Sequence, residues 1–401
     1  MSREGGVGWP GWLNGRAILI IGPGVLTLYG MILLTGTVLR SQAPMPADVL
    51  AFLAAARLAA TGQAAMAYDW TTFAQAQAAI LGVGTDAIGG ALGWLNPPHF
   101  FFVVLPLAPL GYGWAWLMWS MAGVLLLAAA AWVVLPRGPA VLAVLAAPSV
   151  MLSISVGQNG LLTAALFGLT FALMDRRPWL AGLALGLLTM KPQFGLLLPV
   201  LLVLTRRWRV FAGAAATAVL TMGLAWAAFG SEAWLAFMPS LSGNASRMLV
   251  EMVSPRLQSV YAFLMRLTGQ REIAMTGHAV VALVAAGVTL RLWLHRPEAA
   301  EESRAAAAIA ASYLITPYVW GYDTPAIPVA ALFLVRAALR EVWLAGEKVT
   351  LILACLLPTA LILWEFPLVA PMAWMLLLWS AYRRARVSPA GRAACLSAAG
   401  T

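Results

Sequence analysis

Carboxylates, one ammonium and a few amides stand out in this chain, because only 10% of its 401 residues are charged. Asp48 and Asp69 lie at the two ends of the stretch PADVLAFLAAARLAATGQAAMAYD, and Lys191 lies in LTMKPQ between two apolar runs. A carboxylate can take up a proton as a general base, and an ammonium can hold an anion such as a phosphate. Ionisable groups in or beside a membrane are costly to keep there, so these residues are candidates for chemistry.

The composition is that of a polytopic membrane protein. Hydrophobic residues make up 62% of the chain, against roughly 45–50% in soluble domains. Apolar runs recur along nearly the whole length, and no stretch is polar enough to form a soluble domain of ordinary size. We therefore expect an all-α polytopic membrane protein that forms one membrane-embedded domain over residues 1–401, with roughly 10–12 transmembrane spans or half-spans.

Basic residues indicate the topology. The net charge is +10, but the Lys and Arg residues fall in short clusters between apolar runs, as topology signals do. We expect a multi-pass protein of the cell membrane, with both termini in the cytoplasm, the lipid bilayer as a partner and no nucleic acid. The cytoplasmic clusters would be Arg137, Arg176-Arg177, Arg206-Arg207-Arg209, Arg291/Arg296 and Arg383-Arg384-Arg386.

Threading the chain between these clusters predicts its segments. They are a first transmembrane helix at 17–39, a first outer loop at 40–97, helical hairpins at 98–229, a second outer segment at 230–272, C-terminal helices at 273–382 and a cytoplasmic tail at 383–401. Within the C-terminal part, we expect helices over 273–294, 305–315, 325–339, 349–366 and 369–382. Cys355 lies in an apolar run and Cys395 in the tail, so no disulfide is expected between them.

Two pairs of short apolar runs read as hairpins. Runs 140–153 and 160–174 are separated by SVGQNG, and runs 179–190 and 193–205 by MKPQ. A run of about 12 residues covers only about 18 Å of a hydrocarbon core about 30 Å thick, so the turns would lie in a depression of the membrane surface. The alternative for the second pair is one kinked span from Trp179 to Leu204, which would leave Lys191 in mid-membrane.

On the hairpin threading, the polar residues that are not topology signals gather on the outer side. This convergence favours a site at the outer face over a transporter or flippase, whose polar groups would be distributed through the depth of the bundle. A membrane scaffold without activity would not need Asp48 and Lys191 together. The converging residues are Asp48, Asp69, Asn96, His99, Gln158, Asn159, Lys191, Arg256, Gln258 and Asp323.

Five motifs, in order, carry a family resemblance. The spacing D-x-x-x-F-x-x-A-A begins at Asp48 and is followed by Gly62 and Tyr68-Asp69. After it come NPPHFFFVVLPLAPL from Asn96, GQNGLL from Gly157, AGLALGLLTMKPQFGLLLP from Ala181 and TPYVWGYD from Thr316. Over roughly residues 40–330 this set resembles glycosyltransferase family 87.

The resemblance implies a GT-C fold and an enzyme of the outer face. Such an enzyme moves a hexose, often mannose, from a polyprenyl phosphate carrier to a glycan or lipid acceptor of the cell envelope, here with inversion. No cofactor is expected beyond this lipid-linked donor, although some enzymes with this fold use a divalent cation. Several members have a histidine in the late turn where this chain has Tyr322-Asp323, so a role for a histidine does not carry over.

The two carboxylates have competing interpretations. Asp48 is expected to be the general base, at the start of an amphipathic stretch that packs on the membrane surface, or else a helix N-cap. Asp69 is the second candidate for catalysis, but it equally suits the cap of a helix that begins near Thr71.

The remaining candidates would bind the substrates. Lys191 and Arg256 are expected to bind the donor phosphate, with Arg247 as an alternative. Gln158 and Asn159 either bind sugar hydroxyls or satisfy the backbone of a tight turn, and His99 either binds phosphate or caps a helix. Gln258, Tyr322 and Asp323 are further substrate-binding candidates. The three histidines are too far apart in sequence to predict a metal site. Trp residues near run ends, including Trp94, Trp114, Trp116, Trp119 and Trp320, are expected in the interfacial belt.

Overall fold

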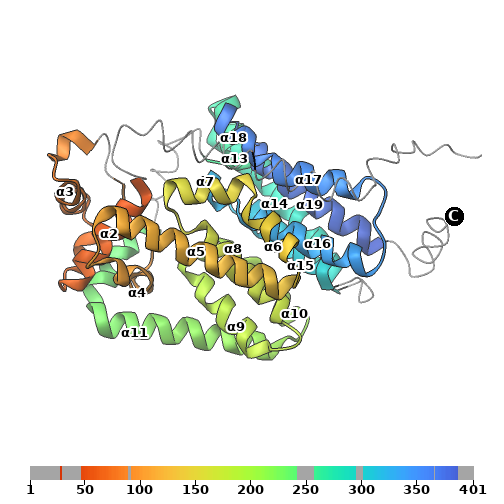
Figure 1. The fold of residues 1–401 in the computed structure, drawn as a ribbon, viewed down its shortest axis with the longest axis horizontal. Coiled ribbons are helices and arrows are strands. Elements are labelled where there is room, and N and C mark those ends of the chain that lie inside the picture. The colour runs from red at the N-terminus through yellow and green to blue at the C-terminus, as the bar shows by residue number, and fades with distance from the viewer. Residues whose placement is uncertain are drawn as a thin grey trace, which may run out of the picture. The chain divides into compact units, whose positions relative to one another are not determined.

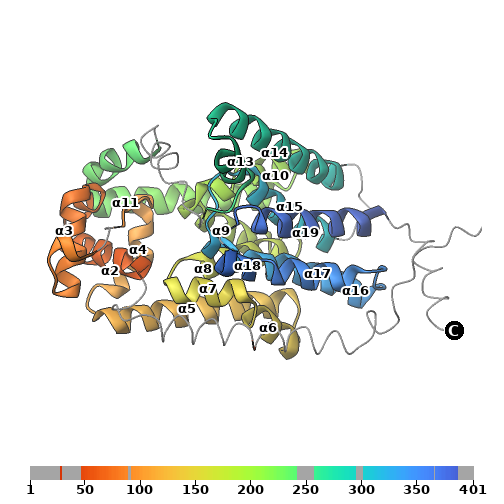
Figure 2. The same cartoon turned by 90° about the horizontal axis from the view of Figure 1, so that it is seen from above.

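The computed structural model describes residue 28 and residues 47–88, 92–241, 257–294, 301–364 and 366–386. Helices are the only regular elements in this part of the chain, where the one β-type pairing is an isolated bridge between Leu257 and Trp320 (Figures 1 and 2). The predicted all-α class is therefore confirmed. The first transmembrane helix predicted at 17–39 lies outside the described residues.

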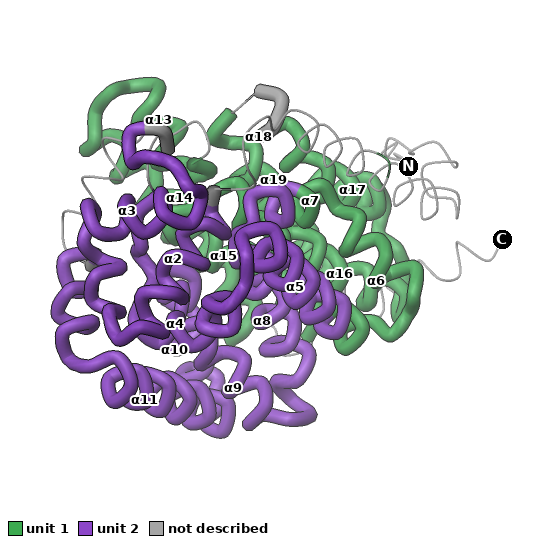
Figure 3. Tube along the Cα trace, turned by 60° about the vertical axis from the view of Figure 1, so that its left-hand side comes forward, with its two compact units in different colours: residues 1–33, 131–151, 255–401 green, residues 34–130, 152–254 purple. Residues whose placement is uncertain are grey.

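The chain divides into two compact units that are interleaved along the sequence (Figure 3). Unit 1 contains residues 1–33, 131–151 and 255–401, and unit 2 contains residues 34–130 and 152–254. Because the boundaries fall inside α5 (Tyr112–Val134) and α7 (Pro148–Val156), each of these helices contributes to both units.

Unit 2 carries the first outer loop and the Lys-Pro hairpin of the sequence analysis. Its further helices are α2 (Ala47–Ala60), α3 (Trp70–Leu81), α4 (Phe101–Val104), α8 (Gly160–Leu173), α9 (Pro178–Leu187), α10 (Leu197–Leu204) and α11 (Trp208–Leu241). Short 3₁₀ helices join them: η2 (Ala64–Tyr68), η3 (Thr85–Ile88), η4 (Pro98–Phe100), η5 (Leu105–Leu107), η6 (Leu188–Met190) and η7 (Pro192–Phe194).

Unit 1 carries the C-terminal helices. They are α13 (Val260–Thr268), α14 (Arg271–Leu294), α15 (Glu301–Ile315), α16 (Ala326–Arg340), α17 (Glu347–Leu356), α18 (Pro358–Trp364) and α19 (Val369–Arg386), together with α6 (Gly138–Leu145) and the 3₁₀ turn η8 (Gly321–Asp323). Helices α15, α16, α17 and α19 pack as neighbours (Figure 2). The boundaries of α15, α16 and α19 lie within a few residues of those predicted, because each helix is one apolar run between polar turns. The run predicted at 349–366 is instead divided into α17 and α18, because Pro358 begins a new helix.

Four helices in the described residues are long and apolar enough to cross a membrane. They contain Tyr112–Val134, Trp208–Ser240, Arg271–Leu294 and Gly321–Arg340, and a fifth span is possible if α6 and α7, bent by 53°, count as one. Shorter apolar helices occupy Pro98–Leu107, Gly160–Leu173 and Pro178–Met190. The protein is thus a multi-pass membrane protein, in which shorter apolar helices accompany the helices long enough to span the membrane.

Helix α2 is a core helix of unit 2. Residues 49–56 are all buried, and between Val49 and Ala60 only Arg57 and Ala60 are exposed. The amphipathic surface helix predicted here is therefore wrong. The reason is physical: a stretch that is apolar nearly all round is stable only where other elements surround it.

The Lys-Pro segment folds back on itself. Asp175, before α9, forms an ion pair with Arg207, after α10, so the two ends of the segment meet. This geometry belongs to a hairpin and excludes the single kinked span. Helix α9 also lies very close to α11 (Figure 1): a Cβ added to Gly182 would come within 2.7 Å of the Val210 carbonyl oxygen. Gly182 and Gly186, four residues apart, allow this approach as small residues do between membrane helices.

Helix α11 is interrupted at the boundary predicted at residue 229. Gly230 has a φ of 76° and a ψ of 168°, which are not helical, so α11 consists of two helices that meet at this kink. The first of them ends where the sequence predicted, and the second continues to Leu241. The part of the predicted second outer segment that contains Arg247 and Arg256 lies outside the described residues.

Buried ion pairs hold the helices of unit 1 together. Glu302 accepts from Arg336 at 3.1 Å and from Arg340 at 2.7 Å. Arg384, only 2% exposed, pairs with Glu347, itself 1% exposed, and with Glu341 at 3.1 Å. Arg384 therefore joins α19 to α17, a structural role beyond the topology signal predicted for its cluster.

Candidate functional site

Asp48 lies in the first turn of α2, not ahead of the helix as an N-cap would. Its side chain is half-buried, and its charge acts on the phenol of Tyr112, the first residue of α5. The next residue, Val49, touches the turn between α7 and α8: a Cβ added to Gly157 would lie 2.8 Å from the Val49 Cβ. Gly157 also has a φ of 66°, which favours glycine. The GQNG motif therefore packs against the residue that follows Asp48 in α2.

Two tryptophans of α5 hold this turn in place. The indole N–H of Trp116 donates to the Ile154 carbonyl at 3.0 Å, and that of Trp119 donates to the Gln158 carbonyl at 3.3 Å. Both rings are half-buried, Trp94 is buried and Trp114 is 70% exposed, so the tryptophans predicted for the interfacial belt differ in their surroundings. Tyr112, Trp116 and Trp119 lie on one face of α5, spaced by four and three residues.

Gln158 and Asn159 have different roles in the turn. The Gln158 Oε1 accepts from the Asn159 backbone N–H at 2.9 Å, so Gln158 satisfies the turn itself. The Asn159 side chain is 1% exposed, and neither its Nδ2 nor its Oδ1 has a hydrogen-bond partner within the described residues. A buried amide left in this state costs about 1–3 kcal/mol, so Asn159 is the better candidate for binding an external polar group.

An aromatic cluster connects Asp48's helix to the segment that carries His99. The Phe52 ring, one turn after Asp48, lies 5.0 Å from the ring of Trp119 and 5.7 Å from that of Phe100. Both contacts are edge-to-face, a favourable geometry for aromatic pairs. Phe52 thus fixes the positions of α2, α5 and η4 relative to one another inside unit 2.

His99 is a buried, neutral histidine. Its Nε2 lies 3.3 Å from the Thr189 hydroxyl, and its ring stacks on Trp234 at 6.4 Å between centroids. Burial lowers the pKa of His99 to about 4. The Nδ1 atom is buried without a partner in the described part of the chain. His99 therefore offers hydrogen bonds and no positive charge, and it does not cap η4.

Lys191 lies between η6 and η7, at the turn of the Lys-Pro hairpin. The residue is 8% exposed, and its Nζ lies 5.8 Å from the centre of the Phe194 ring, within the range of a cation–π contact. Thr189, which contacts His99, is two residues earlier. His99 and Lys191 are therefore found at the same end of α9, where the hairpin reverses.

Asp69 is the N-cap of α3. Its carboxylate accepts from the Thr72 backbone N–H at 2.8 Å, in an extended backbone conformation typical of caps. The side chain is exposed, and the Thr72 hydrogen bonds lower the pKa of Asp69. A lower pKa makes a carboxylate a weaker base, so the geometry favours the capping interpretation.

Three candidates belong to unit 1. The Gln258 N–H donates to the Val319 carbonyl at 2.6 Å and its Oε1 accepts from the Ala370 N–H at 3.4 Å, while its Nε2 is buried without a partner within the described residues. Asp323, 1% exposed, accepts from the Trp320 N–H at 3.0 Å and closes the late turn. The Trp320 ring stacks parallel to that of Tyr322 at 5.9 Å. This turn is therefore rigid.

The candidates thus form two sets, each within its own unit. Unit 2 contains Asp48, Asp69, His99, Gln158, Asn159 and Lys191, and unit 1 contains Gln258, Tyr322 and Asp323. Arg256 lies outside the described residues. Among those that are described, no group of three or more His, Cys, Asp or Glu side chains could hold a metal ion.

A family model identifies the chain. The model of glycosyltransferase family 87 matches residues 94–317, more than half of the 401 residues. The chain belongs to glycosyltransferase family 87. It is therefore a membrane glycosyltransferase, as the motifs predicted. Comparisons with curated proteins and with solved structures gave no match.

The family 87 match contains His99, Gln158, Asn159, Lys191 and Gln258. It begins after Asp48 and Asp69 and ends before Tyr322 and Asp323. The roles of these four residues in the glycosyltransferase therefore depend on their geometry and on the motif spacing.

Sequence reasoning missed two residues beside the candidates of this glycosyltransferase. Tyr112 faces Asp48, and a signal was present, because Tyr112, Trp116 and Trp119 share the spacing of one helix face. Thr189 contacts His99 from 90 residues away in sequence. Nothing in the sequence indicates that contact. Thr189 donates to the Gly186 carbonyl as an ordinary helical threonine does, so its residue type and position predict only this local hydrogen bond.

Proposed function

We propose that this glycosyltransferase transfers a hexose, most simply mannose, from a polyprenyl phosphate carrier to a cell-envelope lipid or glycan acceptor at the outer face of the membrane. Asp48 is the general base of the reaction. The observation that carries the proposal is the position of the half-buried Asp48 in the turn of α2 that packs, through Val49, against the GQNG turn. This turn holds the buried amide of Asn159, which has no hydrogen-bond partner within the described residues.

The reaction is a single displacement with inversion. The acceptor oxygen attacks the anomeric carbon, and the bond from that carbon to the phosphate oxygen breaks. Asp48 takes the hydroxyl proton as the new bond forms, and the polyprenyl phosphate leaves with the electron pair. The first turn of α2 suits this task because its backbone is fixed by the buried run that follows it.

The leaving phosphate needs a cation. Lys191 supplies it from a largely buried position at the reversal of the hairpin, where an interaction with developing charge is stronger than in water. His99 remains neutral near pH 7 and contributes a hydrogen bond from its imidazole. Arg256 remains a second candidate for the phosphate.

Asn159 supports recognition of the sugar. A hexose hydroxyl can both donate to Oδ1 and accept from Nδ2, which would satisfy both buried atoms. Within unit 1, the buried Gln258 Nε2, Tyr322 and Asp323 are proposed separately as substrate-binding groups.

Donor turnover tests this function. The purified protein in lipid nanodiscs would receive polyprenyl-phosphate mannose, glucose or arabinose separately, together with a membrane lipid and glycan extract as acceptor. We expect one donor to be consumed with release of polyprenyl phosphate, and Asp48→Asn to slow this release. A parallel measurement uses the same protein in sealed liposomes. Transport of intact donor across the liposome bilayer, with none cleaved in either preparation, would overturn the proposal and identify a flippase.

A further inference from the structure

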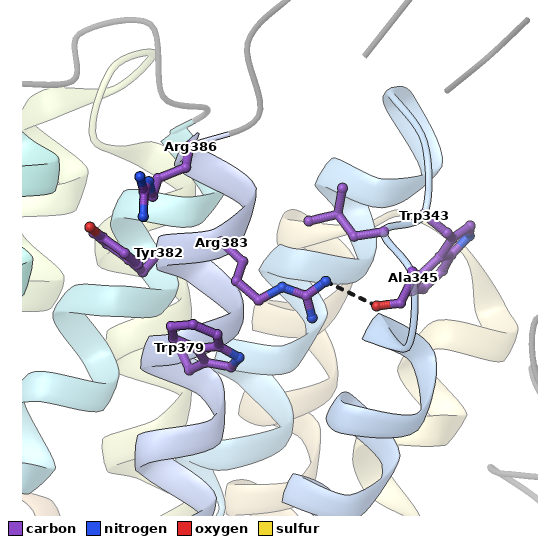
Figure 4. Close-up of a pocket in the computed structure, with 7 residues that line it drawn as sticks. Trp343, Ala345, Trp379, Tyr382, Arg383 and Arg386 are labelled. Atoms are coloured by element: carbon purple, nitrogen blue, oxygen red, sulfur yellow. Dashed lines mark hydrogen bonds between the residues drawn. The ribbon is translucent and has the colours of Figure 1, made fainter. Parts of the chain in front are cut away.

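A pocket in unit 1 is lined by aromatic and basic residues (Figure 4). Its volume is about 330 Å³, within the range of small-molecule sites. The loop between α16 and α17 contributes Trp343, Leu344 and Ala345, and the last two turns of α19 contribute Trp379, Tyr382, Arg383 and Arg386. None of these residues belongs to the proposed transferase machinery, so the pocket needs an explanation of its own.

The charge of the pocket comes from Arg383 and Arg386. Arg383 donates to the Ala345 carbonyl at 3.0 Å, which holds its guanidinium against the loop (Figure 4), and the Arg386 guanidinium lies 5.6 Å from the centre of the Tyr382 ring. The nearby acids are engaged elsewhere, because Glu341 and Glu347 pair with Arg384. The pocket is thus positive and suits an anion.

An exposed apolar stripe leads along α19 to the pocket. Met372, Met375 and Trp379 are 47%, 37% and 55% exposed, and their spacing of three and four residues puts them on one face of the helix. The same face continues at Tyr382 and Arg386. A ligand that fits both parts has an anionic head and a hydrocarbon tail.

We propose that this pocket binds the headgroup of an anionic phospholipid of the membrane surface. The phosphodiester lies between Arg383 and Arg386, whose planar guanidinium groups suit phosphate oxygens. The glycerol region covers Trp379, at the depth where tryptophan is enriched, and an acyl chain follows Met375 and Met372. This site goes beyond the proposed function and does not depend on it.

Lipid titration of the full-length protein in neutral detergent, followed by native mass spectrometry, tests the site. The probes are phosphatidylglycerol, zwitterionic phosphatidylethanolamine and inorganic phosphate. Arg383→Gln with Arg386→Gln should weaken phosphatidylglycerol binding by roughly 30-fold, the attraction of two basic residues for an anionic lipid surface. The matched control is the double variant Arg176→Gln with Arg209→Gln, which removes two exposed arginines of unit 2 and should bind as the wild type does.

The role of the apolar stripe has its own variant. Met372→Gln with Met375→Gln should weaken binding of long-chain phosphatidylglycerol and leave binding of the dihexanoyl form nearly unchanged, because only the long chain reaches these two side chains. Three results would overturn the proposal. The Arg383/Arg386 variant could bind phosphatidylglycerol as tightly as its control does, the wild type could bind phosphatidylethanolamine as tightly as phosphatidylglycerol, or inorganic phosphate could compete for the pocket as strongly as phosphatidylglycerol does. The last would identify a free-anion site.

Discussion

Acidification should destabilise unit 2 through His99. Burial lowers the pKa of this ring from 6.5 to about 4, so the folded state favours the neutral form. The unfolded chain takes up the proton near pH 6.5, and the stabilising contribution is therefore fully present above that pH and lost as the pH falls toward 4. Linkage gives a loss of about 2 kcal/mol at pH 5 and about 3 kcal/mol below pH 4.

The assay measures the melting temperatures of wild type and His99→Gln in detergent, at about pH 7.5 and at about pH 5, with tryptophan fluorescence as the readout of unfolding. We expect the wild type to lose roughly 4–8 °C more than the variant between the two conditions, on the scale of a unit of about 200 residues. Thr189→Val serves as the control and should keep the wild-type pH dependence, because burial, not the Thr189 hydrogen bond, is the main cause of the shift. An identical pH response of wild type and His99→Gln would refute the reasoning.

Three further predictions concern the transfer reaction. Asp48→Asn should lower the transfer rate about 100-fold or more, which is the usual effect of removing a positioned base. Asp69→Asn can still cap α3 and should retain most of the activity. If a donor-turnover assay instead shows the larger loss for Asp69→Asn, the general base is Asp69. Lys191→Met should cost about 2–4 kcal/mol of transition-state stabilisation, seen as a drop in kcat/KM for the donor, and unchanged kinetics would remove Lys191 from the mechanism. Asn159→Leu should abolish sugar binding and raise the melting temperature, because it removes a buried unpaired amide; a lower melting temperature would show that this amide has a structural partner.

The sequence was most informative where one apolar run makes one helix. Helix α14 was predicted at 273–294 and is found at Arg271–Leu294, and α16 was predicted at 325–339 and is found at Ala326–Arg340. The sequence-based prediction of the environment of α2 was wrong. Apolar side chains in a membrane protein face either lipid or other helices, and the periodicity of the sequence does not distinguish these two cases. The break in α11 was predictable for another reason: Gly230 can adopt a positive φ that other residues rarely adopt, and the helix is interrupted at this residue.

The site was predictable by residue type and not by contact. Asp48, Asn159 and Lys191 stood out because polar groups are rare in such a chain, and the structure places all three in unit 2. Their partners, such as Thr189 beside His99, depend on tertiary packing that no local pattern encodes. The different roles of Gln158 and Asn159 likewise depend on one hydrogen bond, in which the Asn159 backbone N–H donates to the Gln158 side chain.

The buried pair of Arg384 and Glu347 makes the order of the loop between α16 and α17 depend on α19. Arg384 donates to the Val342 carbonyl at 3.0 Å, and Glu347 accepts from the Leu344 N–H at 3.1 Å, so one ion pair holds both the side chains and the loop backbone. Removing one partner leaves the other charge buried and unpaired, which costs about 3–5 kcal/mol. Hydrogen exchange of the loop amides therefore reports on the docking of α19, because these amides are protected only while Arg384 is in place.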